Sequence, residues 1–166
     1  MTTFSIREAT LNDVQGVLDI VNHAIAHTTA NYNYDPQTIE AQLQWFGEKQ
    51  QKTFPVFVAD HDGKVVGFST YGTFREKTGY RFTVEHSVYV ADGFSGKGIG
   101  RKLLETLIAK AKEQGFHTMI GGIDASNEDS IAFHRKFGFV ECGVIRESAF
   151  KFDRWLDLLF MQLLLK

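Results

Sequence analysis

The 166-residue sequence predicts an α/β fold with a mixed central β-sheet, and two patterns support this assignment. Apolar residues at helical spacing alternate along the chain with runs rich in β-branched and aromatic residues. Their order is a strand, two helices, three strands, a helix, a strand, a helix and two closing strands. This order requires both hairpins and crossovers, so the sheet must mix antiparallel and parallel neighbours. We expect one domain over residues 1–166, with about six to seven strands flanked by about four helices.

The chain is expected to begin with one strand and two helices. Alternation of apolar and polar residues predicts a strand over 4–8, and helical spacing of apolar residues predicts a helix over 11–25. The pair Asp35-Pro36 is typical of an N-cap followed by proline at the first helical position. A second helix is therefore expected over 36–49.

Three consecutive strands are expected next. The β-rich runs 56–60 and 65–74 are separated by a segment that contains Asp62-Gly63, a strong turn signal. These two runs should form a hairpin. After a polar loop, β-branched and aromatic residues over 80–90 predict the third strand.

The second half of the chain contains the best-defined helix. Apolar residues recur on one helical face from Ile99 to Ala111, which predicts a helix that ends near Gly115. The remaining elements are a strand over 119–124, a helix over 127–137, and closing strands over 140–152 and 155–164.

Composition excludes several classes of partner. The formal net charge of −2 gives no general attraction to nucleic acid or to anionic membranes. No stretch approaches the ~20 apolar residues that span a bilayer, and the N-terminus has no signal-like segment, so a cytoplasmic protein is expected. The single cysteine, Cys142, allows no intrachain disulfide or zinc cluster, so no metal is expected. Cys142 itself is expected to be buried and structural.

A glycine-rich loop precedes the best-defined helix. Small residues there expose backbone N–H groups at a helix N-terminus, whose positive partial charge favours anions. The spacing matches neither the dinucleotide fingerprint nor the phosphate loop of NTPases, and a simple tight turn is the alternative. The sequence thus predicts a pyrophosphate cradle formed by Ser95, Gly96, Lys97, Gly98, Ile99, Gly100 and Arg101.

Several motifs in order resemble those of GNAT superfamily N-acetyltransferases over nearly the whole chain. The loop is similar to the R/Q-x-x-G-x-G/A signature of the acetyl-CoA site, although Ser95 stands where Arg or Gln is usual. The resemblance implies a GNAT fold, with acetyl-CoA as cofactor and CoA as product. Residues 83–90, 127–134, 136–139 and 151–157 more narrowly resemble phosphinothricin and methionine sulfoximine acetyltransferases. This implies acetylation of the amino group of a small amino-acid-like molecule.

The resemblance also implies roles along the cofactor. Val88 and Val90 would pair their backbones with the pantetheine arm, and Tyr89 or Val90 would supply a backbone N–H to the carbonyl oxygen as it gains charge. Asn127 would hydrogen-bond the cofactor. Ser130 shares one helical stripe with Asn127, so both can face the same ligand.

Two residues are candidates for the chemistry. A bound ammonium must lose a proton before it can attack, and the resemblance assigns this base role to Glu85. Alternation places Glu85 off the apolar face of its strand and His86 on the opposite side, where a structural role is expected. His134 would either protonate the departing thiolate or only position the cofactor. A solvated or structurally paired carboxylate remains the alternative for Glu85.

The acceptor site is less well defined. Arg75 and Arg81 flank the loop before the Glu85 strand, where a guanidinium clamp could hold a substrate carboxylate, or they are ordinary surface charges. Phe74, Tyr32 and Tyr34 would line the acceptor pocket or belong to the core.

The resemblance of residues 151–157 to a dimer-interface segment implies a homodimer, with Asp153 at a position where glycine is frequent. Two other functions remain open. One is acetylation of a protein N-terminus or another amine, and the other is a non-catalytic acyl-CoA sensor. The presence of both Glu85 and His134 argues against the sensor.

Overall fold

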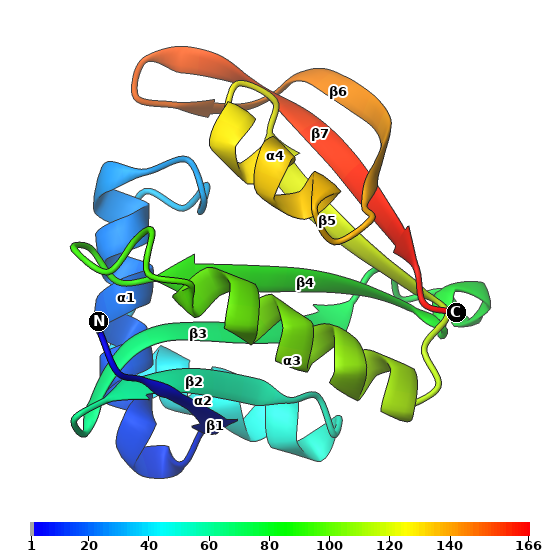
Figure 1. The fold of residues 1–166 in the computed structure, drawn as a ribbon. Helices are drawn as coiled ribbons and strands as arrows, with labels where there is room; N and C mark the ends of the chain where they lie inside the picture. Colours follow the sequence, from blue (N-terminus) through cyan, green and yellow to red (C-terminus); the bar gives the residue numbers. More distant parts are fainter. Residues whose placement is uncertain (1) are drawn as a thin grey trace.

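The fold is a seven-stranded mixed β-sheet with helices on both faces (Figure 1). A computed structural model describes residues 2–166 of the chain. The strand order is β1-β2-β3-β4-β5-β7-β6, and only the β4–β5 pair is parallel within these residues, so the expected mixed α/β sheet is confirmed. The strands are β1 Ser5–Glu8, β2 Val56–His61, β3 Lys64–Thr73, β4 Thr83–Val90, β5 Thr118–Asp124, β6 Val140–Lys151 and β7 Arg154–Leu164.

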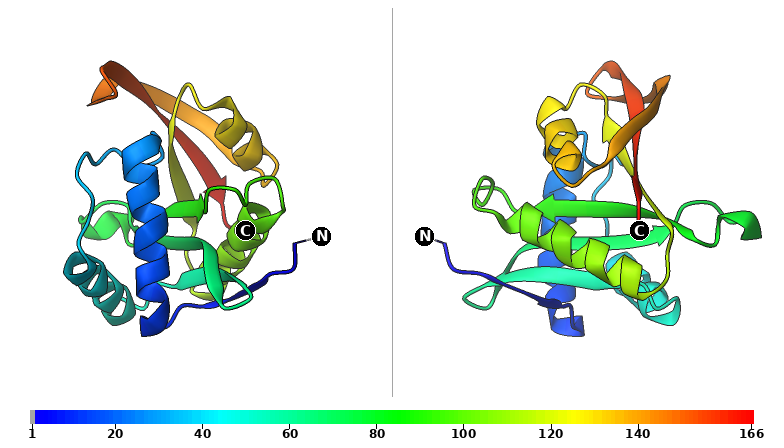
Figure 2. Two further views of the ribbon diagram at one scale, coloured as in Figure 1. Left: turned by 90° about the vertical axis from the view of Figure 1, so that its left-hand side faces the viewer. Right: turned by 45° about the vertical axis from the view of Figure 1, so that its right-hand side comes forward.

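Two α-helices cover each face of the sheet. Figure 2 shows α1 (Val14–His27) and α2 (Ile39–Gln51) on one face, with α3 (Ile99–Glu113) and α4 (Glu128–Arg135) on the other. Because helices lie on both sides, the central strand β3 is buried over most of its length. Within residues 2–166, no helix has the length and apolar character needed to cross a membrane.

The helix α3 packs closely against the middle of the sheet. Leu103, Leu104 and Leu107 are fully buried, and each such side chain stabilises the fold by roughly 1.5–3 kcal/mol. A Cβ at Gly67 of β3 would lie 3.0 Å from side-chain atoms of Ile99 and Leu103, so the glycine permits this close approach. This packing fixes the position of the helix N-terminus and of the loop before it.

The helix α2 begins later than the Asp-Pro pair predicts. Thr38 is its N-cap, and the Thr38 hydroxyl accepts a hydrogen bond from the N–H of Ala41 at 3.2 Å. The preceding residue, Gln37, is held by two hydrogen bonds between its backbone and the Asn22 side chain, at 2.8 and 3.1 Å. No local sequence pattern predicts these contacts with α1. They hold Gln37 outside the helix, so α2 begins at Ile39.

The strand β4 also begins later than predicted, at Thr83. The preceding Thr78–Tyr80 segment forms a 3₁₀ turn, in which the N–H of Tyr80 donates to the carbonyl of Lys77 at 2.9 Å. The Tyr80 ring packs edge-on against Phe74, with 5.8 Å between ring centroids. Aromatic packing within the loop therefore replaces the extended backbone expected there.

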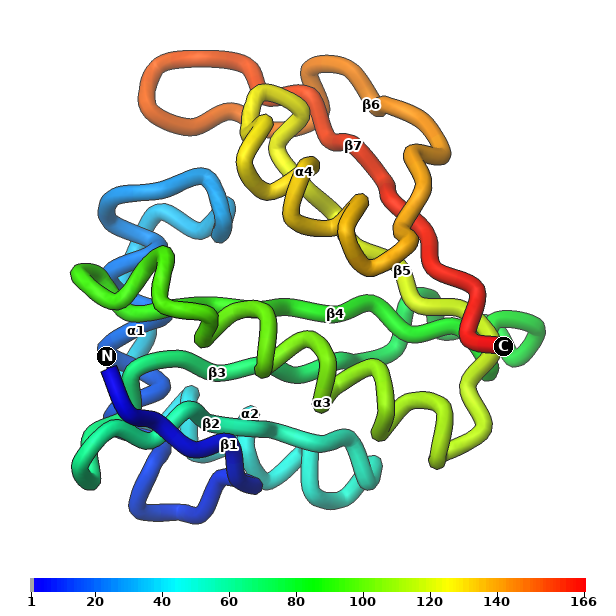
Figure 3. Tube along the Cα trace, viewed as in Figure 1, coloured from blue at the N-terminus to red at the C-terminus, as the bar shows by residue number. Residues whose placement is uncertain are grey.

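The parallel pairing of β4 and β5 is very short. It covers Thr83–Glu85 against Thr118–Ile120, after which β4 continues beside β3 and β5 continues beside β7. The Cα trace shows the two strands separating from that point (Figure 3). From residue 86 onward, β4 has no β5 neighbour, and its edge N–H and C=O groups on that side lack a strand partner among the described residues.

The edge strand β6 is exposed along most of its length. Its hairpin with β7 turns at Phe152 and Asp153, which both have positive φ, 52° and 56°, as a type I′ turn requires. Cys142 lies on this strand and is exposed, so the expectation of a buried cysteine is wrong. The strand also exposes the apolar side chains of Val140, Val144, Ile145 and Phe150.

Candidate active site

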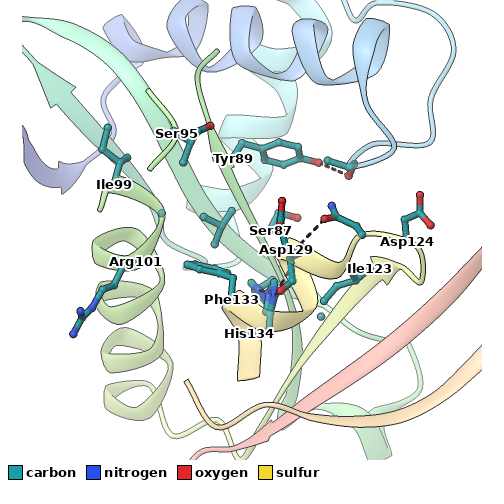
Figure 4. A pocket seen from close by; sticks show the side chains of 18 of the residues that line it. Ser87, Tyr89, Ser95, Ile99, Arg101, Ile123, Asp124, Asp129, Phe133 and His134 are labelled. Carbon is teal, nitrogen blue, oxygen red and sulfur yellow. Dashed lines mark hydrogen bonds between the residues drawn. The ribbon is translucent and has the colours of Figure 1, made fainter. Parts of the chain in front are cut away.

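A cavity of about 620 Å³ lies where β4 and β5 diverge. Its walls come from the second half of β4, the glycine-rich loop, the end of β5 and one side of α4. In Figure 4, Tyr89 and Ser95 lie on one side of it and Phe133 and His134 on the other. Mixed sheets bind ligands at such breaks, because strand ends and helix termini meet there.

The glycine-rich loop presents an uncapped helix N-terminus to this cavity. Gly96 and Gly98 have φ values of 75° and 82°, and Gly98 is the N-cap of α3 without a side-chain cap. The N–H of Lys102 is bonded to the carbonyl of Gly98 at 3.1 Å, so the three preceding N–H groups have no helical partner. Such N–H groups bind phosphate oxygens readily, so the loop fits a pyrophosphate.

Nearly all residues predicted to contact the cofactor line this one cavity. The exception is Lys97, whose Nζ lies 5.2 Å from the centroid of the Phe94 ring. Arg101 lines the cavity, but its Nε donates to Glu105 at 2.9 Å. The predicted residues that line it are Val88, Tyr89, Val90, Ser95, Gly96, Gly98, Ile99, Gly100, Arg101, Asn127 and Ser130.

Asn127 is the N-cap of α4. Its Oδ1 accepts from the N–H of Ser130 at 3.1 Å. Within residues 2–166 the Asn127 amide NH₂ donates no hydrogen bond, so it can donate to a ligand in the cavity.

Two buried histidines face one another beside the cavity. The Nε2 atoms of His86 and His134 are 2.9 Å apart, and each ring also contacts a backbone carbonyl through Nδ1. The partner of His86 is Ile120 at 3.0 Å, and the partner of His134 is Ser130 at 2.7 Å. Burial, followed by the charge of His134, lowers the pKa of His86 to about 3, and burial also lowers the pKa of His134. The sequence pattern did not reveal that His86 contacts His134.

Glu85 lies on the other side of β4, next to the end of the β4–β5 pairing. Its Oε1 is 3.6 Å from the point where a Cβ of Gly122 would stand, and Gly122 lines the cavity. Burial raises the pKa of Glu85, and the positive charge of Arg75 partly opposes this rise. A carboxylate with a raised pKa beside a cavity is suited to proton transfer near neutral pH.

Two of the predicted acceptor residues lie near Glu85. Arg75 is close enough to influence its charge, and the guanidinium of Arg75 lies 5.3 Å from the centroid of the Phe74 ring. Phe74 packs edge-on against Phe160 of β7, at 6.2 Å between centroids. Phe160, like Glu85, points toward Gly122. These residues form one group on the sheet face opposite the histidine pair.

The other predicted acceptor residues lie apart from this group. The guanidinium of Arg81 lies 4.6 Å from the centroid of the exposed Phe82 ring. Tyr34 is 63% exposed, and its hydroxyl donates to the carbonyl of Phe150. Neither residue lines the cavity between β4 and β5.

Asp124 is a cavity residue that the sequence pattern did not identify. Burial alone would raise its pKa, but hydrogen bonds from Thr29 at 2.6 Å, Ser126 at 2.8 Å and Arg154 at 3.1 Å lower it overall. The hydroxyl oxygen of Tyr32 is buried nearby and has no hydrogen-bond partner within residues 2–166. The sequence signal that could have identified Asp124 is an aspartate at the carboxyl end of an apolar strand, because ligand sites in α/β sheets form at such ends.

Comparison with known proteins identifies relatives along the whole chain. The family model described as Acetyltransferase (GNAT) family matches residues 19–139. The L-methionine sulfoximine/L-methionine sulfone acetyltransferase of Pseudomonas paraeruginosa is 44% identical over 160 residues, covering 96% of this chain and 93% of that protein. The phosphinothricin N-acetyltransferase of Alcaligenes faecalis is 33% identical over 159 residues, covering 95% and 81%.

Solved structures agree with the family match. An N-acetyltransferase from Staphylococcus aureus superposes with a TM-score of 0.97 at 47% identity, covering 99% of both chains. A ribosomal-protein-alanine N-acetyltransferase from Brucella melitensis gives 0.95 at 46%, covering 96% of this chain and 99% of that one. A Salmonella typhimurium protein solved with its cofactor acetyl-CoA gives 0.95 at 41%, covering 98% and 94%. The GNAT fold expected from the sequence is confirmed, and the chain belongs to the GNAT family of N-acetyltransferases.

Proposed function

We propose that this enzyme transfers the acetyl group of acetyl-CoA directly to the amino group of a small amino-acid-like acceptor. Methionine sulfoximine, methionine sulfone and phosphinothricin are the proposed acceptor types, and the names of two relatives support this choice. The main structural support is the cavity between β4 and β5, which is lined by an uncapped helix N-terminus and by His134, with Glu85 reaching Gly122 at its wall.

The residues around the cavity suit an elongated ligand with a pyrophosphate. The N–H groups at the start of α3 would hold the phosphates, with Arg101 close by. The unpaired edge of β4 at Val88 and Val90 would pair with the amide groups of the pantetheine arm as a neighbouring strand does. Bound acetyl-CoA supplies the thioester, and the N–H of Val90, on the unpaired edge, would stabilise negative charge on its carbonyl oxygen, whereas the N–H of Tyr89 faces β3.

Glu85 would act as the base. An ammonium acceptor has no free lone pair, and an ionised Glu85 would take its proton directly or through one water molecule. The position of Glu85 on the sheet face opposite the histidine pair would let the acceptor approach from that face. Arg75, which already influences the charge of Glu85, would pair with the acceptor carboxylate, and Phe74 would contact its apolar part.

The decisive experiment is acetyl-CoA-dependent thiol release by the purified protein. The acceptor panel contains methionine sulfoximine, methionine sulfone, phosphinothricin, ordinary amino acids, polyamines and peptides. We expect selective turnover of the first three. Turnover of polyamines alone would overturn this acceptor class while leaving the family assignment intact, and acetyl-CoA binding without any turnover would favour a sensor.

Acetylation of a protein N-terminus is a second candidate function. It is favoured by the name of the Brucella melitensis structure, which is a ribosomal-protein-alanine N-acetyltransferase at 46% identity. A peptide acceptor needs an open groove on the Glu85 face and no partner for a free carboxylate. Peptides with an N-terminal alanine therefore belong in the panel, and an Arg75→Ala variant should impair amino-acid acceptors more than peptides.

We also propose that the enzyme is a cytoplasmic homodimer. The exposed apolar side chains of β6 and the exposed Trp155 support association through the β6–β7 hairpin, since monomers rarely expose large apolar patches. The resemblance of residues 151–157 to an interface segment supports the same face. An exposed free thiol, Cys142, suits a reducing compartment.

A further inference from the structure

Ser87 brings to the cavity a hydroxyl group to which the proposed reaction assigns no role. It lies on β4 between Glu85 and Tyr89, and the alternation of side chains along a strand places all three on the same sheet face. Ser87 lines the cavity (Figure 4), and within residues 2–166 its hydroxyl forms no hydrogen bond. A hydroxyl both donates and accepts, so Ser87 can bind a ligand and pass on a proton.

An open space, the Ser87–Gly122 gap, separates these two residues of β4 and β5. One residue beyond the end of the parallel ladder, His86 lies against Gly121, where a Cβ would be 2.8 Å from the ring. The next residue of each strand brings Ser87 level with Gly122. Both residues line the cavity, and Gly122 is exposed although its strand neighbours are buried. A side chain is thus absent at the place where the strands begin to separate.

The Glu85 carboxylate points into the Ser87–Gly122 gap. Its Oε1 atom is 3.6 Å from the Cβ position of Gly122, which lies two residues beyond the ladder partner of Glu85. The carboxylate therefore leans along the sheet toward the level of Ser87. Leu158 Cδ1 and Phe160 Cε1 lie 3.4 and 3.9 Å from the same Cβ position, so the side of the gap toward β7 is apolar.

Strand geometry sets the distances along β4. Successive residues of a strand advance by about 3.4 Å, so Val90, whose N–H is the proposed donor to the acetyl carbonyl, lies about 17 Å from Glu85. A base takes a proton over about 2.6–3.2 Å or through one water molecule, and a carboxylate side chain spans only part of the separation. Ser87 stands between the two, about 7 Å from Glu85 and about 10 Å from Val90 along the strand. A proton path from the acceptor nitrogen to Glu85 therefore passes the Ser87 hydroxyl.

The other hydroxyl and carboxylate groups on this side of the cavity already have partners. The Tyr89 hydroxyl donates to the carbonyl of Ala30 at 3.1 Å, and the Thr29 hydroxyl donates to Asp124 at 2.6 Å. The Asp124 carboxylate accepts four hydrogen bonds in all. Ser87 is thus the hydroxyl that is free to meet a ligand.

We propose that Ser87 and Gly122 form the amine subsite, in which the Ser87 hydroxyl accepts a hydrogen bond from the acceptor ammonium and a water molecule in the gap links that hydroxyl to Glu85. This inference rests on the proposed acetyl transfer. One N–H bond of the ammonium breaks, and its electron pair stays on nitrogen, where it becomes available for acetylation. The proton goes to Ser87, the hydroxyl proton of Ser87 goes to the water, and a proton of the water goes to Glu85. The serine and the water are unchanged, and one proton has moved from the acceptor to the carboxylate.

A binding cycle tests the contact between Ser87 and the amine without turnover. Wild type and Ser87→Ala, each saturated with CoA in place of acetyl-CoA, are titrated calorimetrically with methionine sulfone and with 4-(methylsulfonyl)butanoate, the same molecule without its amino group. We expect Ser87→Ala to weaken methionine sulfone binding about tenfold and to leave the deamino analogue within about twofold, because only the ammonium loses a partner. An equal loss for both ligands, or no loss for either, would overturn the subsite.

Ser87→Thr and Ser5→Ala complete the binding cycle. Ser87→Thr keeps a hydroxyl at this position and should restore methionine sulfone binding to within about threefold of the wild type. Ser5→Ala removes an exposed hydroxyl from β1 and should bind both ligands as the wild type does. A folded Ser87→Thr protein that binds as weakly as Ser87→Ala would contradict a role for the hydroxyl.

Gly122→Ala tests the gap itself. An added Cβ would meet no atom closer than 3.4 Å, so the variant should fold. Its methyl group would displace the water beside Glu85, which disfavours the ionised form and raises the pKa of that carboxyl further. Carboxyl ¹³C NMR should show Glu85 titrating at higher pH in Gly122→Ala than in the wild type, and the measurement needs no acceptor. An unchanged titration would remove the water from the proton path and overturn the proposal.

Turnover separates this inference from the proposed function. With whichever amine the acceptor panel identifies, Ser87→Ala should lower kcat about tenfold with the KM for acetyl-CoA within about twofold, and Ser87→Thr should recover most of kcat. Full turnover by Ser87→Ala would refute the subsite and leave the proposed function intact. If no amine in the panel is acetylated, the proposed function fails, but the binding cycle and the NMR titration still decide whether the subsite exists.

Discussion

Glu85 is partly buried and lies at the last residue pair of the β4–β5 ladder, where the two strands begin to separate. A base acts only in its ionised form, so acetylation should rise with pH through the raised pKa of Glu85. Glu85→Gln should lower kcat about 10²-fold and remove that acid limb, with little change in acetyl-CoA affinity. Steady-state pH profiles at saturating acetyl-CoA measure both effects.

Glu76→Gln is the matched control, because Glu76 is an exposed carboxylate in the loop that leads to β4. We expect its profile to coincide with that of the wild type. If Glu85→Gln kept the acid limb and most of kcat, another group would have to be the base.

Asp124 ties the α1–α2 loop to the sheet through Thr29 and joins β5 to β7 through Arg154. Asp124→Asn should lower the free energy of unfolding by about 1–3 kcal/mol at pH 7, whereas Asp35→Asn, at an exposed site, should change it little. The folded-state pKa of Asp124 is lowered, so its contribution is complete above the unfolded value of about 3.9 and is lost as pH falls through the folded value.

Urea unfolding at several pH values measures this difference. The difference in the free energy of unfolding between wild type and Asp124→Asn should become smaller as the pH falls below about 4. A difference that stayed constant would mean that Asp124 stabilises through packing and not through its charge.

At the residue scale, the sequence indicated which side chains could take part in chemistry but not which of them contact one another. Alternation along β4 correctly separated Glu85 from His86, since the period of a strand depends only on local backbone geometry. It could not place His86 against His134, because that contact joins residues 48 positions apart through the close approach at Gly121. The sequence did not identify Asp124 as a site residue for a similar reason, because its partners Thr29 and Arg154 come from distant segments of the chain.

The start of α3 offers a sharp test at the scale of an element. Gly98 has a φ of 82°, and a Cβ there would meet no atom within 4 Å, so only backbone conformation opposes a side chain. Gly98→Ala should weaken acetyl-CoA binding roughly tenfold, because the N–H groups that follow would turn away from the phosphates. Isothermal titration with acetyl-CoA measures this loss.

Gly47→Ala is the matched control in α2. A Cβ at Gly47 also meets no atom within 4 Å, but this glycine lies inside a helix and lacks a positive φ. We therefore expect the free energy of unfolding to rise by about 0.5–1 kcal/mol with no change in affinity. Unchanged acetyl-CoA affinity in Gly98→Ala would remove the loop from the binding site.

Element predictions succeeded where local patterns dominate. The apolar stripe of α3 determines both the helix and its buried face, and the structure has it at Ile99–Glu113. The predicted start of α2 was wrong because Asn22 holds Gln37 in an extended conformation and Thr38 supplies the cap. Tertiary contacts of this kind override a favourable Asp-Pro pair without leaving a local signal.

At the scale of the whole molecule, the β6–β7 hairpin carries the proposed dimer interface. Val144 and Trp155 are 48% and 60% exposed, and a second copy would cover them. We expect sedimentation velocity to show a dimer for the wild type and a monomer for the double variant Val144→Lys, Trp155→Lys. Leu11→Lys, at a site 65% exposed elsewhere, should remain dimeric. A monomeric wild type would overturn the dimer proposal.

The short β4–β5 pairing has a consequence for how the molecule opens. Three residue pairs form the parallel ladder between β1–β4 and β5–β7, and the two groups of strands also share one apolar core, so the backbone should open at this ladder at less than the free energy of global unfolding. Acetyl-CoA seated in the break would touch both groups and hold them together, adding about 2.7 kcal/mol at 100 times its Kd. Amide exchange in β5, β6, β7 and α4 should slow accordingly. The supply of acetyl-CoA would then govern how long each molecule survives proteolysis as well as how fast it works.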